Sequence, residues 1–154
     1  MRYITMPTFA FAIAQTLSAQ TFQSYGKIQV AVIDVIRAKE RIPPGMPPRF
    51  GIAAGAGHEL VIIKARIRVP SGQPLLQFTR SECQLLLASP STSDSVALQA
   101  RGIVLHSPEN ATVTWEDTIE FPFEIRESLP VATFHLGTLS FDLQQFPAAR
   151  IKAP

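Results

Sequence analysis

The stretch that decides the fold class is Glu59-Leu60-Val61-Ile62-Ile63-Lys64-Ala65-Arg66-Ile67-Arg68-Val69. From Val61 onward every second position is aliphatic, and the positions between them become basic at Lys64, Arg66 and Arg68. Successive side chains of a β-strand point to opposite faces of its sheet. The pattern therefore predicts a strand with one packed face and one wet face, as antiparallel sheets commonly have.

A second long strand region is predicted from Thr112 to Arg126, where apolar side chains take odd positions and glutamates take even ones. Asp117 interrupts the apolar phase, which predicts a turn that divides the region into two strands. Pro122 has no N–H to donate, so it predicts an edge position or irregular pairing.

Shorter alternating runs, separated by Pro, Gly and Ser clusters, complete the pattern. The run from Lys27 to Arg37 changes phase after Val32, which predicts a β-bulge or a strand covered on both faces. Further strands are predicted at Cys83 to Ala88, from Val96 to Leu105, and from Phe134 to Leu143 with a break at Gly137. About seven strands at this spacing predict an all-β sandwich or barrel.

The connection from Ala38 to Gly57 carries Pro43-Pro44-Gly45 and Pro47-Pro48, which cannot continue a helix or a central strand. A structureless connection of about 20 residues is longer than usual in a compact domain, so a functional or mobile loop is expected here.

The order of three segments resembles the telokin-like, immunoglobulin-fold domains of secreted bacterial proteins. The segments are a leading Gly26-Lys27-Ile28-Gln29-Val30, the stretch from Gly57 to Val69, and a closing Ile119 to Ile125 followed by Leu136 to Leu143. The resemblance covers residues 25–145. It implies an immunoglobulin-like antiparallel β-sandwich, with a small β-barrel as the alternative, and it supplies no site residues.

The amino terminus has the layout of a secretory signal peptide. An apolar run from Tyr3 to Ala14 follows Arg2, and Leu17-Ser18-Ala19 offers a cleavage site. The expected domains are a signal peptide at 1–19 and the sandwich at 20–154, and the expected location is secreted, periplasmic or cell-envelope. The alternative is that the apolar run forms a strand or helix of the mature fold.

Charge and composition exclude several classes of function. The 154 residues carry 14 basic and 12 acidic side chains, a net charge of +2, so a nucleic-acid partner is not expected. The apolar run at the amino terminus is too short to span a bilayer, so an integral membrane protein is not expected either. Cys83 is the single cysteine of the sequence, so it has no disulfide partner within the chain. The sequence therefore lacks the Cys–Trp–Cys arrangement of antibody domains.

No chemical motif points to catalysis, a metal or a cofactor. His58, His106 and His135 are widely spaced, and the Gly51–Gly57 run lacks the Lys-Ser/Thr of a phosphate loop. Cys83 precedes three leucines, so an inert buried thiol is expected. Asn110-Ala111-Thr112 matches the N-glycosylation pattern but is interpreted as an exposed loop.

Two stripes of like charge are predicted, one formed by Lys64, Arg66 and Arg68 and the other by Glu116, Glu120 and Glu124. They are interpreted as a solvated sheet face with cross-strand ion pairs. The alternative is that Lys64, Arg66 and Arg68 bind an acidic protein or an anionic glycan.

The expected function is an exported binding or accessory module, not an enzyme, with an unknown protein or glycan partner and no cofactor. One alternative is a small lipid or ligand carrier with a cavity between sheets. Another is a self-assembling envelope subunit, because an unprotected sheet edge accepts another strand.

Overall fold

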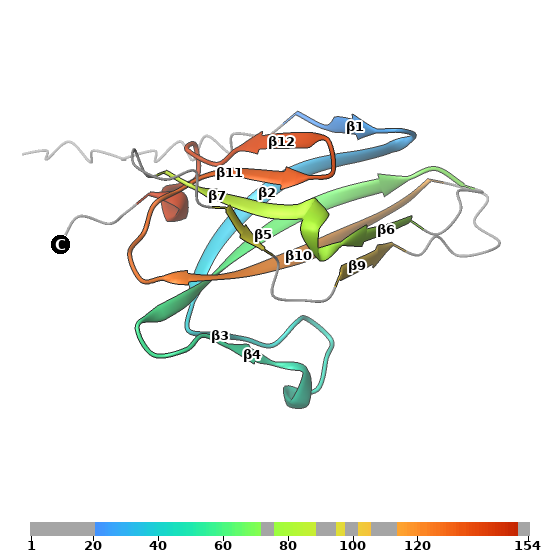
Figure 1. Ribbon diagram of the computed structural model, residues 1–154. Helices are drawn as coiled ribbons and strands as arrows, with labels where there is room; N and C mark the ends of the chain where they lie inside the picture. The colour runs from blue at the N-terminus through green and yellow to red at the C-terminus, as the bar shows by residue number, and fades with distance from the viewer. Residues whose placement is uncertain (1–20, 72–75, 89–94, 98–101, 106–113, 151–154) are drawn as a thin grey trace, which may run out of the picture.

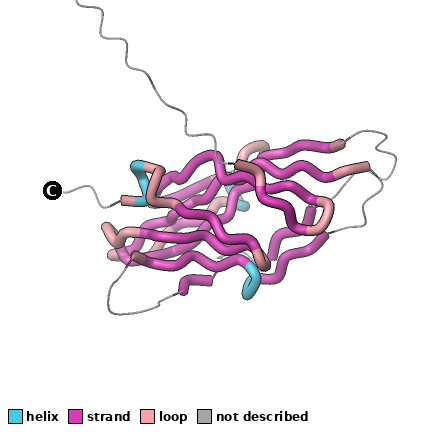
Figure 2. Tube along the Cα trace, turned by 90° about the horizontal axis from the view of Figure 1, so that it is seen from above, coloured by secondary structure: helices cyan, strands magenta, loops and turns pink. Residues whose placement is uncertain are grey.

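The computed structural model describes residues 21–71, 76–88, 95–97, 102–105 and 114–150, and most of these residues lie in strands (Figures 1 and 2). The strands are β1 Gln23–Tyr25, β2 Ile28–Ala38, β3 Glu40–Arg41, β4 Ile52–Ala53, β5 His58–Val69, β6 Leu76–Thr79, β7 Cys83–Leu87, β8 Ser95–Ala97, β9 Gly102–Leu105, β10 Trp115–Arg126, β11 Val131–Leu136 and β12 Leu139–Asp142. Three 3-10 helices of one turn occupy Pro48–Phe50, Arg80–Glu82 and Pro147–Ala149. In this part of the chain no helix has the length and apolar character needed to cross a membrane.

The long strands form two antiparallel sheets that pack against each other. The first sheet has the order β1-β2-β5-β10, and the second has the order β12-β11-β7-β8. Two small sheets, the strand pairs β3-β4 and β6-β9, are also present among the described residues. No pairing among these residues joins the two four-stranded sheets, so the arrangement is a sandwich and not the closed barrel that the sequence left open.

Strand β5 lies in the middle of the first sheet and follows the alternation of its sequence. It pairs with β2 on one side and with β10 on the other. The register with β2 shifts between Val32 and Asp34, which confirms the bulge predicted from the change of phase.

Strand β10 corrects one prediction and confirms another. It runs unbroken from Trp115 to Arg126, paired with β5 throughout, so the turn predicted at Asp117 is wrong. Asp117 stays in the strand because it pairs with Ile67 of β5, and its exposed carboxylate accepts the N–H of Thr118 at 2.7 Å. Pro122 lies on an edge strand of the described sheet, as predicted.

The core lies between the two sheets and consists of their inward-facing apolar side chains. Five phenylalanines, all less than 2% exposed, are its largest members: Phe78, Phe121, Phe123, Phe134 and Phe141. The Phe134 ring contacts three of the others, with ring centroids 5.1 Å from Phe121 and 5.9 Å from both Phe123 and Phe141. The cluster therefore joins the first sheet to the second.

The Pro- and Gly-rich connection is not structureless, contrary to the prediction. Residues 39–57, here called the lobe, form the β3-β4 pair with a 3-10 turn between its strands. Figure 1 shows the lobe set off from the two sheets at the bottom of the view. The expected signal peptide at 1–19 lies outside the described residues.

Candidate functional site

The two predicted charge stripes lie on the outer face of the first sheet, side by side. Glu116 is opposite Arg68 and Glu120 is opposite Lys64 in the β5–β10 register. Arg68 Nε donates to Glu116 Oε2 at 2.6 Å, and Arg66 Nε lies 3.4 Å from the other oxygen of Glu116. The cross-strand ion pairs thus form, whereas the binding role of Lys64, Arg66 and Arg68 stays a prediction.

The two charge stripes are exposed to solvent at the end where Arg68 and Glu116 lie. The side chains of Arg68 and Glu116 are 40% and 42% exposed. The hydrogen bond from Arg68, with the charges of Arg68 and Arg66, holds the pKa of Glu116 below its usual value of 4.5. Arg68 also stacks on Phe22, with its guanidinium carbon 4.0 Å from the ring centroid.

At its Lys64 end the outer face becomes the floor of a cleft roofed by the lobe. The cleft has a volume of about 800 Å³. Its floor comes from β2, β5 and β10, and its roof from the lobe. Its apolar lining is Ile33, Ile62, Ile119 and Pro122 from the sheet, and Pro43, Pro44, Phe50 and Ile52 from the lobe.

Ion pairs hold the lobe in place over the sheet. Arg41 donates from Nε to Glu120 Oε2 at 2.9 Å and from its second nitrogen to Oε1 at 2.5 Å. This two-point contact raises the pKa of Arg41 above its already high value. Farther along the lobe, the Gly55 N–H donates to Glu124 Oε1 at 2.8 Å. The roof of the cleft is therefore fastened to β10 at two points.

The charged side chains of the cleft are balanced in sign. Arg41 and Lys64 contribute two positive charges, and Asp117 and Glu120 contribute two negative charges. None of the ion pairs among the described residues involves Lys64. The cleft therefore combines a mostly apolar lining with no net charge.

The lobe also exposes large apolar side chains, of which Phe50 lines the cleft. The large hydrophobic residues exposed in the described chain are Ile42 at 47%, Met46 at 54% and Phe50 at 50%, and all three belong to the lobe. Clusters of exposed apolar surface on a soluble domain mark interaction sites more often than single exposed residues do.

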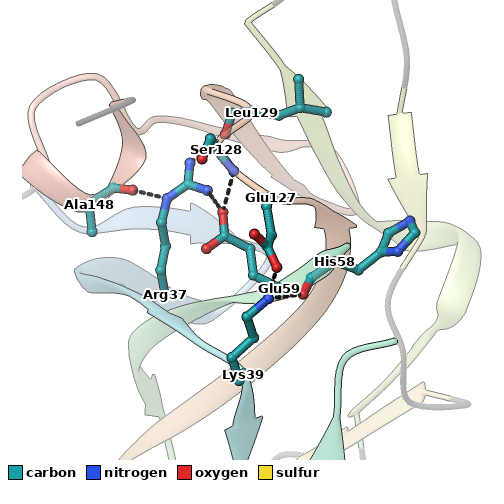
Figure 3. A network of polar contacts seen from close by, with 8 residues as sticks. All are labelled: Arg37, Lys39, His58, Glu59, Glu127, Ser128, Leu129 and Ala148. Atoms are coloured by element: carbon teal, nitrogen blue, oxygen red, sulfur yellow. Dashed lines mark hydrogen bonds and ion pairs between the residues drawn. The ribbon is translucent and has the colours of Figure 1, made fainter. Parts of the chain in front are cut away.

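A polar network at the end of β2 that leads into the lobe fixes a corner of the fold (Figure 3). Arg37 pairs with Glu59 and donates to the carbonyl oxygens of Leu129 and Ala148, both at 2.5 Å. Glu59 also accepts the N–H of Ser128 at 3.0 Å. Every group here has a partner within the fold, so the network has a structural role.

The other predicted site residues do not come together. Cys83 is fully buried, as expected, and burial raises the pKa of its thiol to about 12. His58 begins β5, with Nδ1 3.0 Å from the carbonyl oxygen of Ala56, and His135 lies on β11 in the second sheet. Within the described ranges, no three His, Cys, Asp or Glu side chains gather as metal ligands. His106 and Asn110 lie outside those ranges.

Sequence reasoning missed most of the cleft. Its lobe residues lie in the segment predicted to be a loop, and Ile62 lies on the phase predicted to be wet. A signal was present, because Leu60 and Ile62 precede Lys64 on that phase and are 1% and 0% exposed. Two large aliphatic residues at the start of a polar phase indicate that something covers that end of the face.

No family model matches the chain, and no curated protein or solved structure shows significant similarity to it.

Proposed function

We propose that this protein is an exported, immunoglobulin-like binding module without chemistry of its own, and that it holds an extended apolar segment of a partner protein in the cleft. The observation that carries the proposal is the cleft, which has a mostly apolar lining and includes the half-exposed ring of Phe50. An apolar centre with a polar rim is the usual anatomy of a protein interface.

The strand order supports the finer, immunoglobulin-like and telokin-like assignment. One sheet of the immunoglobulin fold contains strands A, B and E, which correspond to β2, β5 and β10. The other sheet contains strands G, F, C and C′, which correspond to β12, β11, β7 and β8. The export part rests on the apolar amino terminus.

The charge balance of the cleft favours a protein segment over an anionic glycan. Glu120 already neutralises Arg41, and Glu116 already neutralises part of Arg66 and Arg68. Lys64 is the basic residue of the predicted trio that lines the cleft. We therefore place Lys64 in the binding site and Arg66 and Arg68 beside it.

A small-molecule carrier is the second candidate, because a cleft of about 800 Å³ is within the range of small-ligand sites. Native mass spectrometry of protein from its natural host separates the two candidates. A bound molecule of a few hundred daltons would favour the carrier.

The experiment selects binding peptides from a displayed random library and measures their affinity by fluorescence anisotropy. We expect Phe50→Ser to weaken selected peptides about tenfold or more, because Phe50 offers an exposed aromatic anchor at the cleft. The matched control is Arg66→Ser on the same face, with an expected change of about twofold or less.

Two outcomes would contradict the proposal. If the selected peptides bind the Phe50→Ser variant as tightly as they bind the natural protein, they do not use the cleft. Loss of binding in Lys64→Ser/Arg66→Ser/Arg68→Ser, with steep salt dependence and no effect of Phe50→Ser, would indicate the acidic-partner function of the charge stripe.

A further inference from the structure

Strand β10 presents the longest open edge of the described sheets. It has 12 residues and pairs with β5 alone, whereas the other edge strands β1, β8 and β12 have 3, 3 and 4 residues. Strand β8 contacts β10 without pairing with it. A long strand edge with free backbone groups is a template for another chain.

The even-numbered residues of β10 direct their backbone groups toward this edge. The register with β5 is unbroken through Pro122, and a proline fits such a ladder where its nitrogen points away from the partner strand. A second even residue, Thr118, gives independent support, because its N–H is donated to the Asp117 side chain at 2.7 Å instead of to β5.

Two of the three even positions from 118 to 122 therefore offer no N–H to a new strand. The carboxylate of Asp117 already occupies the N–H of Thr118, and Pro122 supplies no N–H at all. Glu120, which lies between Thr118 and Pro122, is the one position of the three with an N–H to offer.

We infer that Asp117 and Pro122 guard the β10 edge against pairing with a second copy of this chain, and that this guard keeps the protein from extending its first sheet into a dimer. The guard acts on the backbone donors of the edge. Asp117 and Pro122 also line the cleft, so the guard is tested on the protein without any peptide.

Sedimentation velocity over a range of concentrations tests the guard. The double variant Asp117→Ala/Pro122→Thr restores two edge donors, and we expect its self-association constant to exceed that of the natural protein by about tenfold or more. Hydrogen exchange should then show slowed amides at Thr118 and Glu120 as concentration rises.

Two controls isolate the mechanism. Asp117→Asn keeps an oxygen acceptor for the Thr118 N–H, so it should remain as monomeric as the natural protein. Asp34→Ala removes the similar 2.8 Å contact to the Val35 N–H on β2, away from the β10 edge, and should leave the exchange of the β10 amides unchanged as concentration rises.

The inference is overturned if the double variant folds and stays monomeric, or if the natural protein itself associates with protection of β10 amides. Should the double variant fail to fold, the exposed single change Asp117→Ala decides. Unchanged exchange of the Thr118 amide in that variant would show that Asp117 does not cover it.

Discussion

The two faces of the first sheet are built from the same strands and have opposite characters. Inward side chains of β5 such as Ile63 and Ile67 are fully buried, whereas its outward residues Arg66 and Arg68 are 46% and 40% exposed. On the outer face, only the end beneath the lobe is apolar. The inner face therefore supplies stability, and the partner binding that we propose belongs to the outer face.

The largest expected effect comes from breaking the inner face. Phe121→Ala removes a fully buried ring whose centroid lies 5.1 Å from that of Phe134 in the other sheet. We expect the free energy of unfolding, measured by urea denaturation, to fall by about 3–5 kcal/mol because a cavity replaces the ring.

The matched control on the outer side is Phe50→Ala, at a ring that is 50% exposed. Its expected change in the free energy of unfolding is within about 0.5 kcal/mol. Similar losses for Phe121→Ala and Phe50→Ala would show that the lobe is part of the core and would remove the contrast between the faces.

An intermediate effect is expected at the corner formed by Arg37 and Glu59. Both side chains are mostly buried, at 17% and 16% exposure, and Arg37 also satisfies two carbonyl oxygens. We expect Arg37→Met to lower the free energy of unfolding by about 2–4 kcal/mol, because a buried carboxylate loses its counter-charge.

A double-mutant cycle with Glu59→Met measures how much of this loss belongs to the pair. The control is Arg66→Met, whose pair with Glu116 is exposed and should cost less than about 1 kcal/mol. Equal losses at Arg37 and Arg66 would mean that burial does not distinguish the two kinds of ion pair.

The inner face was predictable from sequence because its information is local. Alternation fixed the buried phase of β5, and the change of phase after Val32 located the bulge. Pro122 indicated an edge because the missing N–H is a property of the residue itself. Each of these predictions needed only the side-chain period of a strand and the chemistry of one residue.

The outer face was harder to predict because its residues depend on distant segments. The break in alternation at Asp117 predicts a turn, since alternation alone does not reveal that the Asp117 carboxylate accepts the N–H of Thr118. Arg41 and Glu120 are 79 residues apart and meet because the lobe folds back over β10. Glycines and prolines predicted a loop there but not its path, so the cleft appeared only in the structure.

The smallest expected effect is at the exposed pair of Arg68 and Glu116, and it depends on pH. The hydrogen bond from Arg68 lowers the pKa of Glu116 in the folded protein, so ionised Glu116 favours the folded state. Stability from this source is present above the unfolded pKa and is lost as pH falls through the folded one. Glu116→Gln should therefore lower the Tm by about 1–2 °C or less at pH 7, and the difference should vanish once the pH falls below the lowered pKa of Glu116. Glu40→Gln is the control, because Glu40 forms no ion pair with the described residues and should leave the Tm difference flat across this range. A Tm difference for Glu116→Gln that persists unchanged at low pH would mean that the carboxylate stabilises the strand by packing and not by its charge.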